Sequence, residues 1–229
     1  METNIIEILL ENCPEDWDIE NFEALGSFSS EFLGSLSDWV LDSNAVKMLV
    51  YENVFADGLE ALEDSVERVA SSFDHPTPEV FHSERSYGEH WAENPLDPTD
   101  DRIGADVGIV QAINEKYGHS CAYDVITAHE MTHAKLASSG ISQHLAPYAE
   151  EVICDIYSGV YSGRNGLPTD IFTGEIGGSP ADNAHPAGSE RVDFYLRAHD
   201  LASRYPVYHP FYQNGINNLV NEALQKYSC

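Results

Sequence analysis

The residues best suited to chemistry in this chain lie in the string HEMTH, which contains His129, Glu130 and His133. On a helix the two histidines stand one turn apart, so their imidazoles point the same way and can hold one metal ion. Glu130 projects beside that ion and can take a proton from a metal-bound water. The motif therefore predicts the core of a zinc hydrolase site. Two surface histidines on a helix are the alternative for so short a string.

A catalytic zinc ion usually has three protein ligands and one open position, so HEMTH requires a third ligand. Glu151 and Asp155 are four residues apart and share one face of a predicted helix. We expect Glu151 to bind the metal and Asp155 to hold a metal-bound histidine from behind. Glu150 is the alternative ligand. We prefer Glu151, because the residue four positions after Glu150 is Cys154, which accepts a histidine N–H less well than a carboxylate does.

The segment HPAGSERV, residues 185–192, adds a histidine and an arginine. His185 can donate a hydrogen bond to the oxyanion that forms when water attacks a peptide carbonyl. Arg191 does not lose its proton, so it can fix this segment to a carboxylate such as Asp155 or Glu190. Taken alone, the segment is equally consistent with the start of a helix that carries an incidental histidine.

Taken in order, HExxH, ExxxD and HPxxxERV resemble the gluzincin metallopeptidases, and within them the HtpX and CaaX prenyl protease family, over about residues 122–200. The resemblance implies a zinc metalloendopeptidase. It also implies roles for six residues: Zn2+ ligands His129, His133 and Glu151; general base Glu130; oxyanion stabiliser His185; and a structural or substrate-side Arg191. The chain departs from that family in lacking its membrane helices and in placing only 17 residues between His133 and Glu151. It therefore resembles a compact soluble relative, and its substrate does not follow from the resemblance.

The charge of the chain is strongly negative and uneven. The formal net charge is −28: residues 1–104 hold 25 acids and 4 bases, net −21, and residues 105–229 hold 14 acids and 7 bases, net −7. Such a field repels nucleic acids and membrane surfaces and attracts basic partners. We therefore expect a basic protein as a candidate partner and neither nucleic acid nor membrane. The protein or peptide substrate is what the resemblance to metallopeptidases implies. A solvated acidic surface, as in adaptation to high salt, is the simpler explanation of the charge.

The acidity also motivates a competing function, an inhibitor that mimics nucleic acid and keeps only a structural or vestigial metal site. A metal-dependent hydrolase that acts on something other than peptides is a third candidate. No apolar run approaches the ~20 residues of a membrane helix, and the N-terminus has acids where a secretory signal has basic residues. The four cysteines show no paired spacing and are expected to be free thiols, with Cys154 packed rather than metal-bound. These features predict a cytoplasmic protein.

The expected fold is mainly α with a small β-sheet (α+β), as in a gluzincin-like metallopeptidase domain. We divide it into an acidic, mostly helical part at residues 1–104 and a catalytic core at 105–229, or take both as one continuous domain. Short helices are expected in residues 1–43. A long helix is expected from Asn44, with Asn44 as its N-cap, either unbroken or broken near Asp57 and Gly58.

The remaining elements follow from periodicity and turn residues. Residues 74–103 are expected to form a loop region with a strand near Val80–His82. The histidines of this region, His75, His82 and His90, are expected to be surface residues. The apolar stretch Val107–Val110 is a candidate sheet edge before a helix that ends at Tyr117. The motif helix is expected between a Ser120 cap and Gly140. After it come a helix at 147–163, a long loop at 164–184, a helix after His185 and one around 216–227.

Overall fold

The computed structural model describes residues 44–84 and 87–227, with side chains from residue 55 onward. The chain divides into two compact units, Met1–Asp57 and Gly58–Cys229. The short helices expected in residues 1–43 and the capping side chain of Asn44 lie outside the described residues. Position 104, where we divide the chain by charge, lies inside the second unit.

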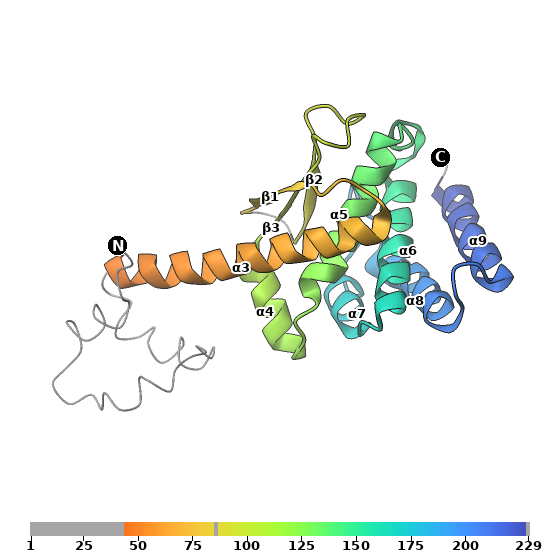
Figure 1. Cartoon of the computed structure of the whole chain (residues 1–229). Coiled ribbons are helices and arrows are strands. Elements are labelled where there is room, and N and C mark those ends of the chain that lie inside the picture. The colour runs from red at the N-terminus through yellow and green to blue at the C-terminus, as the bar shows by residue number, and fades with distance from the viewer. Residues whose placement is uncertain (1–43, 85–86, 228–229) are drawn as a thin grey trace. The chain divides into compact units, whose positions relative to one another are not determined.

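The described chain is mainly helical with one small sheet, as expected (Figure 1). Helix α3 runs unbroken through Asp57 and Gly58, and none of the described helices is both long and apolar enough to span a membrane. The helices are α3 (Asn44–Phe73), α4 (Val107–Tyr117), α5 (Ala122–Ser138), α6 (Pro147–Asn165), α7 (Asp170–Ile176), α8 (Gly188–Arg204) and α9 (Pro210–Tyr227), with a 3-10 turn at Ser142–His144. The strands are β1 (Glu79–His82), β2 (Glu89–Trp91) and β3 (Arg102–Ala105).

The sheet has the strand order β1-β3-β2, with β1 parallel and β2 antiparallel to β3. Strand β1 matches the strand predicted near Val80–His82. The prediction that Val107–Val110 forms a sheet edge is wrong, because these residues begin α4. Asp106 stops the preceding strand and starts this helix: its side chain accepts hydrogen bonds from the backbone N–H groups of Gly108 and Ile109, both at 3.1 Å.

The ends of the motif helix α5 differ in part from the prediction. Its N-cap is Cys121 rather than Ser120, and Asn114 of α4 supplies the capping group instead, accepting from the backbone N–H of Ala122 at 2.9 Å. At the other end, Gly140 takes the left-handed conformation expected of a residue that terminates a helix. The predicted loop at 164–184 is also only partly correct, because it contains α7.

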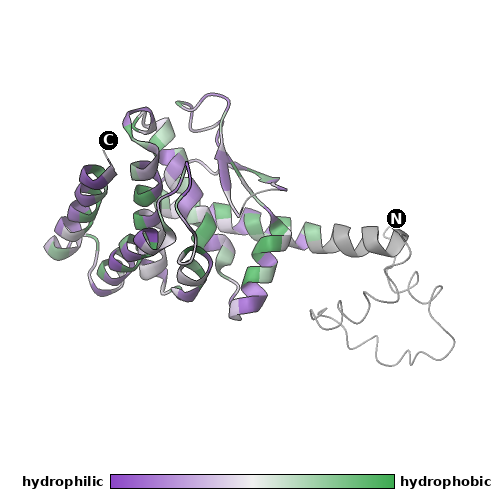
Figure 2. Cartoon of the chain, turned by 180° about the vertical axis from the view of Figure 1, so that it is seen from behind, coloured by the Kyte–Doolittle hydropathy of each residue, from purple (hydrophilic) through white to green (hydrophobic). Residues whose placement is uncertain are grey.

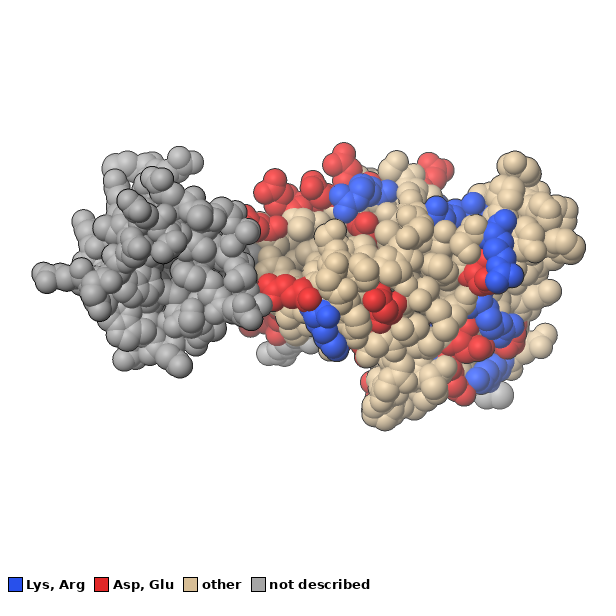
Figure 3. Space-filling view, turned by 90° about the horizontal axis from the view of Figure 1, so that it is seen from below, with Lys and Arg blue, Asp and Glu red and all other residues tan. Residues whose placement is uncertain are grey.

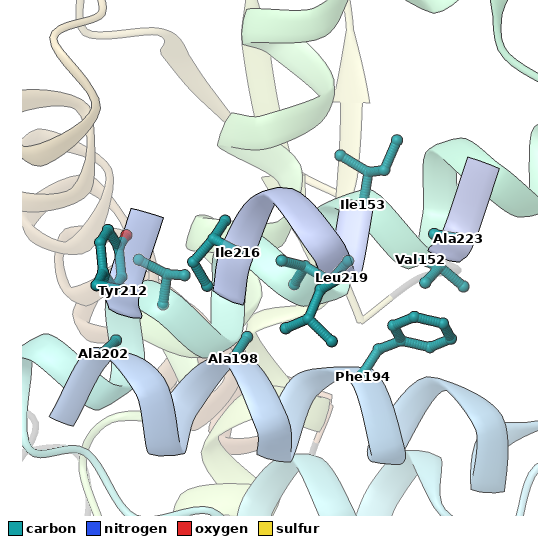
Figure 4. Packing of buried hydrophobic residues seen from close by; sticks show 11 residues of the cluster. Val152, Ile153, Phe194, Ala198, Ala202, Tyr212, Ile216, Leu219 and Ala223 are labelled. Atoms are coloured by element: carbon teal, nitrogen blue, oxygen red, sulfur yellow. The ribbon is translucent and has the colours of Figure 1, made fainter. Parts of the chain in front are cut away.

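The core is built around α6, which packs against α5, α8 and α9. Residues of the helices alternate between hydrophobic and hydrophilic along their length (Figure 2). A buried cluster joins three of these helices (Figure 4): Val152, Ile153, Ile156 and Val160 from α6, Phe194, Ala198 and Ala202 from α8, and Tyr212, Ile216, Leu219 and Ala223 from α9.

Two glycines let α6 and α8 approach closely. A Cβ atom at Gly159 would overlap the backbone oxygen of Tyr195, and one at Gly163 would overlap the backbone oxygen of His199. Both obstacles are backbone atoms, which cannot move aside as a flexible side chain can. The spacing of α6 and α8, and with it the position of their site residues, therefore depends on these two glycines.

We predict that Gly159→Ala lowers the free energy of unfolding by about 1–3 kcal/mol, because the added methyl group forces α6 and α8 apart. The matched control is Gly178→Ala, where the new Cβ atom meets nothing within 4 Å. Urea unfolding followed by circular dichroism measures both. Equal stability of the two variants would contradict the proposed close packing.

Candidate metal centre

The candidate site lies where α5, α6 and the start of α8 meet. Helix α5 carries HEMTH, α6 carries the acidic pair predicted to serve it, and His185 precedes α8. The register of α5 against α6 is fixed in part by Ser158, whose hydroxyl donates to the backbone oxygen of Val125 at 2.8 Å. On the other side of α5, Asp124 accepts hydrogen bonds from Ser65 and Arg68 of α3 at 2.7 and 2.8 Å.

Three predicted ligands converge on one point. The Nε2 atoms of His129 and His133 are 3.3 Å apart. The two carboxylate oxygens of Glu151 lie 3.3 Å from these atoms, Oε2 from His129 and Oε1 from His133. Zinc binds nitrogen and oxygen at about 2.0–2.1 Å in tetrahedral sites, which places neighbouring ligand atoms about 3.3–3.4 Å apart. The distance between the two imidazole nitrogens therefore matches that of neighbouring zinc ligands, and each oxygen of Glu151 lies at the same distance from one of the imidazoles.

Glu151 is the partner in this set that most clearly requires a cation. Its Oε2 atom is buried and makes no hydrogen bond of normal geometry, although nitrogens of His129, His185 and Arg191 lie 3.3–3.5 Å away. Burial raises the pKa of Glu151, but contacts with the two motif histidines outweigh burial and hold that pKa well below its ordinary range. An ionised, buried carboxylate with an unsatisfied oxygen fits a metal ligand.

Each motif histidine has a carboxylate on its other ring nitrogen. His129 Nδ1 lies 3.0 Å from Asp155 Oδ1, and His133 Nδ1 lies 3.0 Å from Glu150 Oε1. Ser142 in turn donates to Glu150 at 2.8 Å. A carboxylate at Nδ1 fixes the proton there and leaves Nε2 free to bind a metal. Glu150 thus lies behind His133 and is not one of the groups that converge with Glu151. The sequence analysis did not predict this placement.

Asp155 also binds Arg191, one of the two partners that we expect for this arginine. The guanidinium Nε and Nη2 atoms donate to the two carboxylate oxygens at 2.8 and 2.9 Å, and Asp155 is fully buried. Burial lowers the pKa of Arg191, but the hydrogen bonds to Asp155 outweigh it and raise that pKa. This bidentate ion pair holds α8 against α6 directly behind His129.

The surroundings favour positive charge at both motif histidines. Burial lowers the pKa of His129, but hydrogen bonds to Asp155 and Glu151 outweigh burial and raise it to about 9. Burial likewise lowers the pKa of His133, and its contacts with Cys154, Glu150 and Glu151 raise it well above the ordinary value. A site with this excess of carboxylates attracts cations, whether protons or a metal ion.

Cys154 lies closer to the motif than its predicted packing role requires. Its thiol sulfur and one nitrogen each of His129 and His133 all lie within 4.8 Å of one another, and the residue is fully buried. We nevertheless take Glu151 as the third zinc ligand, because its oxygens are already at 3.3 Å from both imidazoles. The thiol is free, as is that of Cys121, the other cysteine within the described residues.

His185 lies at the open side of the site. Its Nδ1 atom is 3.1 Å from Asp182 Oδ1, which also accepts from the backbone N–H groups of His185 and Ala184 at 2.7 and 2.8 Å. Its Nε2 atom is 3.5 Å from Glu151 Oε2, and 41% of the side chain is exposed. Asp182, which the sequence analysis did not single out, therefore orients His185 toward the point of convergence.

A cavity of about 370 Å3 opens onto these groups and is lined by His129, Glu130, His185 and Arg191. Its apolar wall comes from three elements: Ile113 of α4, Val125 and Ile126 of α5, and Ile171, Phe172 and Ile176 of α7. Glu130 is 8% exposed. It is packed against Gly88, where a Cβ atom would lie 2.8 Å from Glu130 Oε1. Of the seven residues selected from the sequence, four line this cavity: His129, Glu130, His185 and Arg191. The other three, His133, Glu151 and Asp155, do not line it but lie 3.0–3.3 Å from His129.

Comparison of the chain with protein-family models, with curated proteins and with solved structures gave no match. The resemblance to gluzincins therefore stays a prediction that rests on the motifs and on the geometry of the site.

The two neighbouring glutamates give a matched test of the third ligand. We predict that Glu151→Gln lowers zinc affinity more than 100-fold, because it removes a charged group that faces both imidazole Nε2 atoms. Glu150→Gln should lower it only ~10–100-fold, the usual loss for a group behind a ligand. Competition with a chromophoric chelator measures both affinities. A larger loss in Glu150→Gln would mean that the two roles are exchanged.

Proposed function

We propose that this protein is a zinc-dependent endopeptidase that cleaves peptide bonds with an activated water molecule. The observation that carries the proposal is the 3.3 Å spacing among His129, His133 and Glu151, with a carboxylate behind each imidazole. These three residues would hold a zinc ion, and His129 also lines the cavity in which a substrate would bind. A bound Zn2+ would supply the Lewis acidity that acidifies water and polarises a peptide carbonyl.

Glu130 is the group that takes the proton in this proposal. It follows a proposed zinc ligand directly and lines the same cavity, so a water molecule in that cavity is within its reach. After attack, the same carboxyl group can deliver the proton to the leaving amine. Packing against Gly88 leaves the side chain little room to turn away.

His185 and the cavity wall act on the substrate. The Asp182 carboxylate orients His185, so that its Nε2 atom can donate a hydrogen bond to the developing oxyanion. The apolar wall formed by α4, α5 and α7 can hold an apolar side chain of a peptide next to the bond that is cleaved. These features favour a peptide over the other substrates that the third candidate function, a hydrolase acting on something other than peptides, would require.

The charge of the surface bears on the competing inhibitor function. On the face in Figure 3, basic side chains lie beside acidic ones. Ion pairs such as Lys226–Glu190 and Arg197–Glu222, at 2.8 and 2.7 Å, occupy several of the few basic residues. Because basic residues are few, most acidic residues add to the net negative charge of the chain. This charge suits both a solvated surface and the attraction of basic peptides. The charge does not indicate whether the protein is a metal-dependent enzyme. A test of catalysis must therefore distinguish the peptidase from the inhibitor.

The decisive variant is Glu130→Gln. It should retain one zinc ion per chain and lower the rate of peptide cleavage by ~100- to 10,000-fold, because it removes the proton acceptor and leaves the ligands in place. Cleavage of a peptide library is followed by mass spectrometry, with metal content measured on the same samples. An inhibitor that mimics nucleic acid would be unaffected by the change. Cleavage by wild type that survives verified metal removal would refute the proposal.

Gly88→Ala tests the placement of Glu130 without changing its chemistry. The new methyl group would lie 2.8 Å from Glu130 Oε1 and 2.5 Å from Ile126 Cγ2, so the carboxyl group must shift. We predict a fall in kcat of ~10- to 100-fold with zinc affinity unchanged. Gly108→Ala is the control, because its Cβ atom meets only Asp106 Oδ1 at an ordinary 3.4 Å. Unchanged kcat in Gly88→Ala would show that this contact does not position the base.

A further inference from the structure

Cys154 is a buried nucleophilic group that the proposed peptidase does not use. It lies three residues after Glu151 on α6, so it shares the side of that helix that faces the motif histidines. Its sulfur and the two histidine nitrogens lie within 4.8 Å of one another. The residue is fully buried, so its thiol is hidden from solvent.

We propose that the centre contains a second donor set for thiophilic metal ions, in which the sulfur of Cys154 joins the two motif histidines and replaces the carboxylate of Glu151. The two third donors differ in kind. A carboxylate is a hard oxygen ligand, whereas a thiolate is a soft sulfur ligand that selects softer ions. One pair of imidazoles thus serves two metal classes, and the metal ion determines which residue of α6 completes the set.

Distances explain why zinc and a softer ion choose differently. Each Glu151 oxygen already lies 3.3 Å from one of the imidazoles, so a zinc ion needs little rearrangement to use this carboxylate. A thiolate at a metal–sulfur distance of about 2.3 Å requires nitrogen–sulfur separations of about 3.5–3.6 Å. The sulfur, now within 4.8 Å of each nitrogen, must approach by up to about 1.3 Å. For an ion with a strong preference for sulfur, the metal–sulfur bond offsets the energetic cost of this shift. Binding of the ion displaces the thiol proton to solvent.

Occupation of this set has a functional consequence. An ion bound by Cys154 uses both histidines that the proposed zinc site needs, so the two ions exclude each other. A thiophilic ion would then remove zinc from the peptidase and leave the Glu151 carboxylate without its metal. The structure therefore assigns Cys154 as the residue through which such ions displace zinc.

Cadmium titration of the metal-free full-length protein, with a phosphine reductant, tests the proposal through the ultraviolet thiolate-to-cadmium charge-transfer band. The wild type should develop this band and saturate at one Cd2+ per chain. Cys154→Ser should lose the band. The control changes the other three thiols together, Cys13→Ser, Cys121→Ser and Cys229→Ser, and should retain it. Cys154→Ala replaces the serine variant where circular dichroism shows that serine disrupts folding.

Two results would overturn the proposal: a band that persists in Cys154→Ser, or stoichiometric Cd2+ binding without any band. His133→Ala provides an independent check, because it keeps the thiol and should weaken Cd2+ binding at least 10-fold. Zinc binding by the same wild-type preparation separates the two hypotheses. Zinc bound without a cadmium band would refute the second donor set alone, whereas failure to bind either ion would also refute the proposed peptidase site.

Discussion

The Asp155 carboxylate is the group on which the rest of the site depends, because it joins three helices at one buried point. Its oxygens bind His129 of α5 and Arg191 of α8, while its own backbone belongs to α6. Removing one partner of such a buried pair leaves an uncompensated charge and typically costs about 3–5 kcal/mol. The same ion pair that orients an imidazole therefore also holds the helices together, so the stability of the fold and the geometry of the site cannot be varied independently at this position.

Helix α6 distributes these tasks along two neighbouring ridges with a spacing of four residues. One ridge carries Glu151 and Asp155 at the site and then Gly159 and Gly163, where α8 comes closest. The other carries Glu150 and Cys154 next to His133 and then Ser158, which bonds to the backbone of α5. Side chains four residues apart lie above one another on a helix. The packing of Gly159, Gly163 and Ser158 against the neighbouring helices therefore also fixes the site residues that precede them on the same ridges. The register of α6 is thus the structural basis of the centre.

Helical periodicity explains which parts of the site could be predicted from the sequence. The spacing in HEMTH and between Glu151 and Asp155 determines shared faces, and the structure brings these residues together as that spacing suggests. The contact between Arg191 and Asp155 joins two helices far apart in sequence and was expected only as one of two options. Spacing within a helix gives no distance to a neighbouring helix. The positions of Glu150 behind His133 and of Cys154 near both imidazoles therefore required the packed structure.

Elements that depend on tertiary contacts were the ones that the sequence did not reveal. Strands β2 and β3 are three and four residues long and exist because they pair with each other and with β1. Helix α7 is seven residues long, too short for periodicity to stand out among the glycines and prolines around it. His75 and His90, expected at the surface, instead lie 3.2 and 2.7 Å from the buried carboxylate of Asp101. Strand pairing brings Asp101 and these histidines together, a long-range contact that local sequence does not indicate.

X-ray absorption at the zinc edge of the zinc-loaded protein tests the central claim most directly, because it reports the atoms bound to the metal without reference to any substrate. The account predicts one zinc ion per chain, bound by nitrogen and oxygen only at about 2.0–2.1 Å, with the outer-shell scattering of two imidazoles. A protein that binds no zinc, or a first shell that contains sulfur at about 2.3 Å, would contradict the assignment of His129, His133 and Glu151 as the zinc ligands.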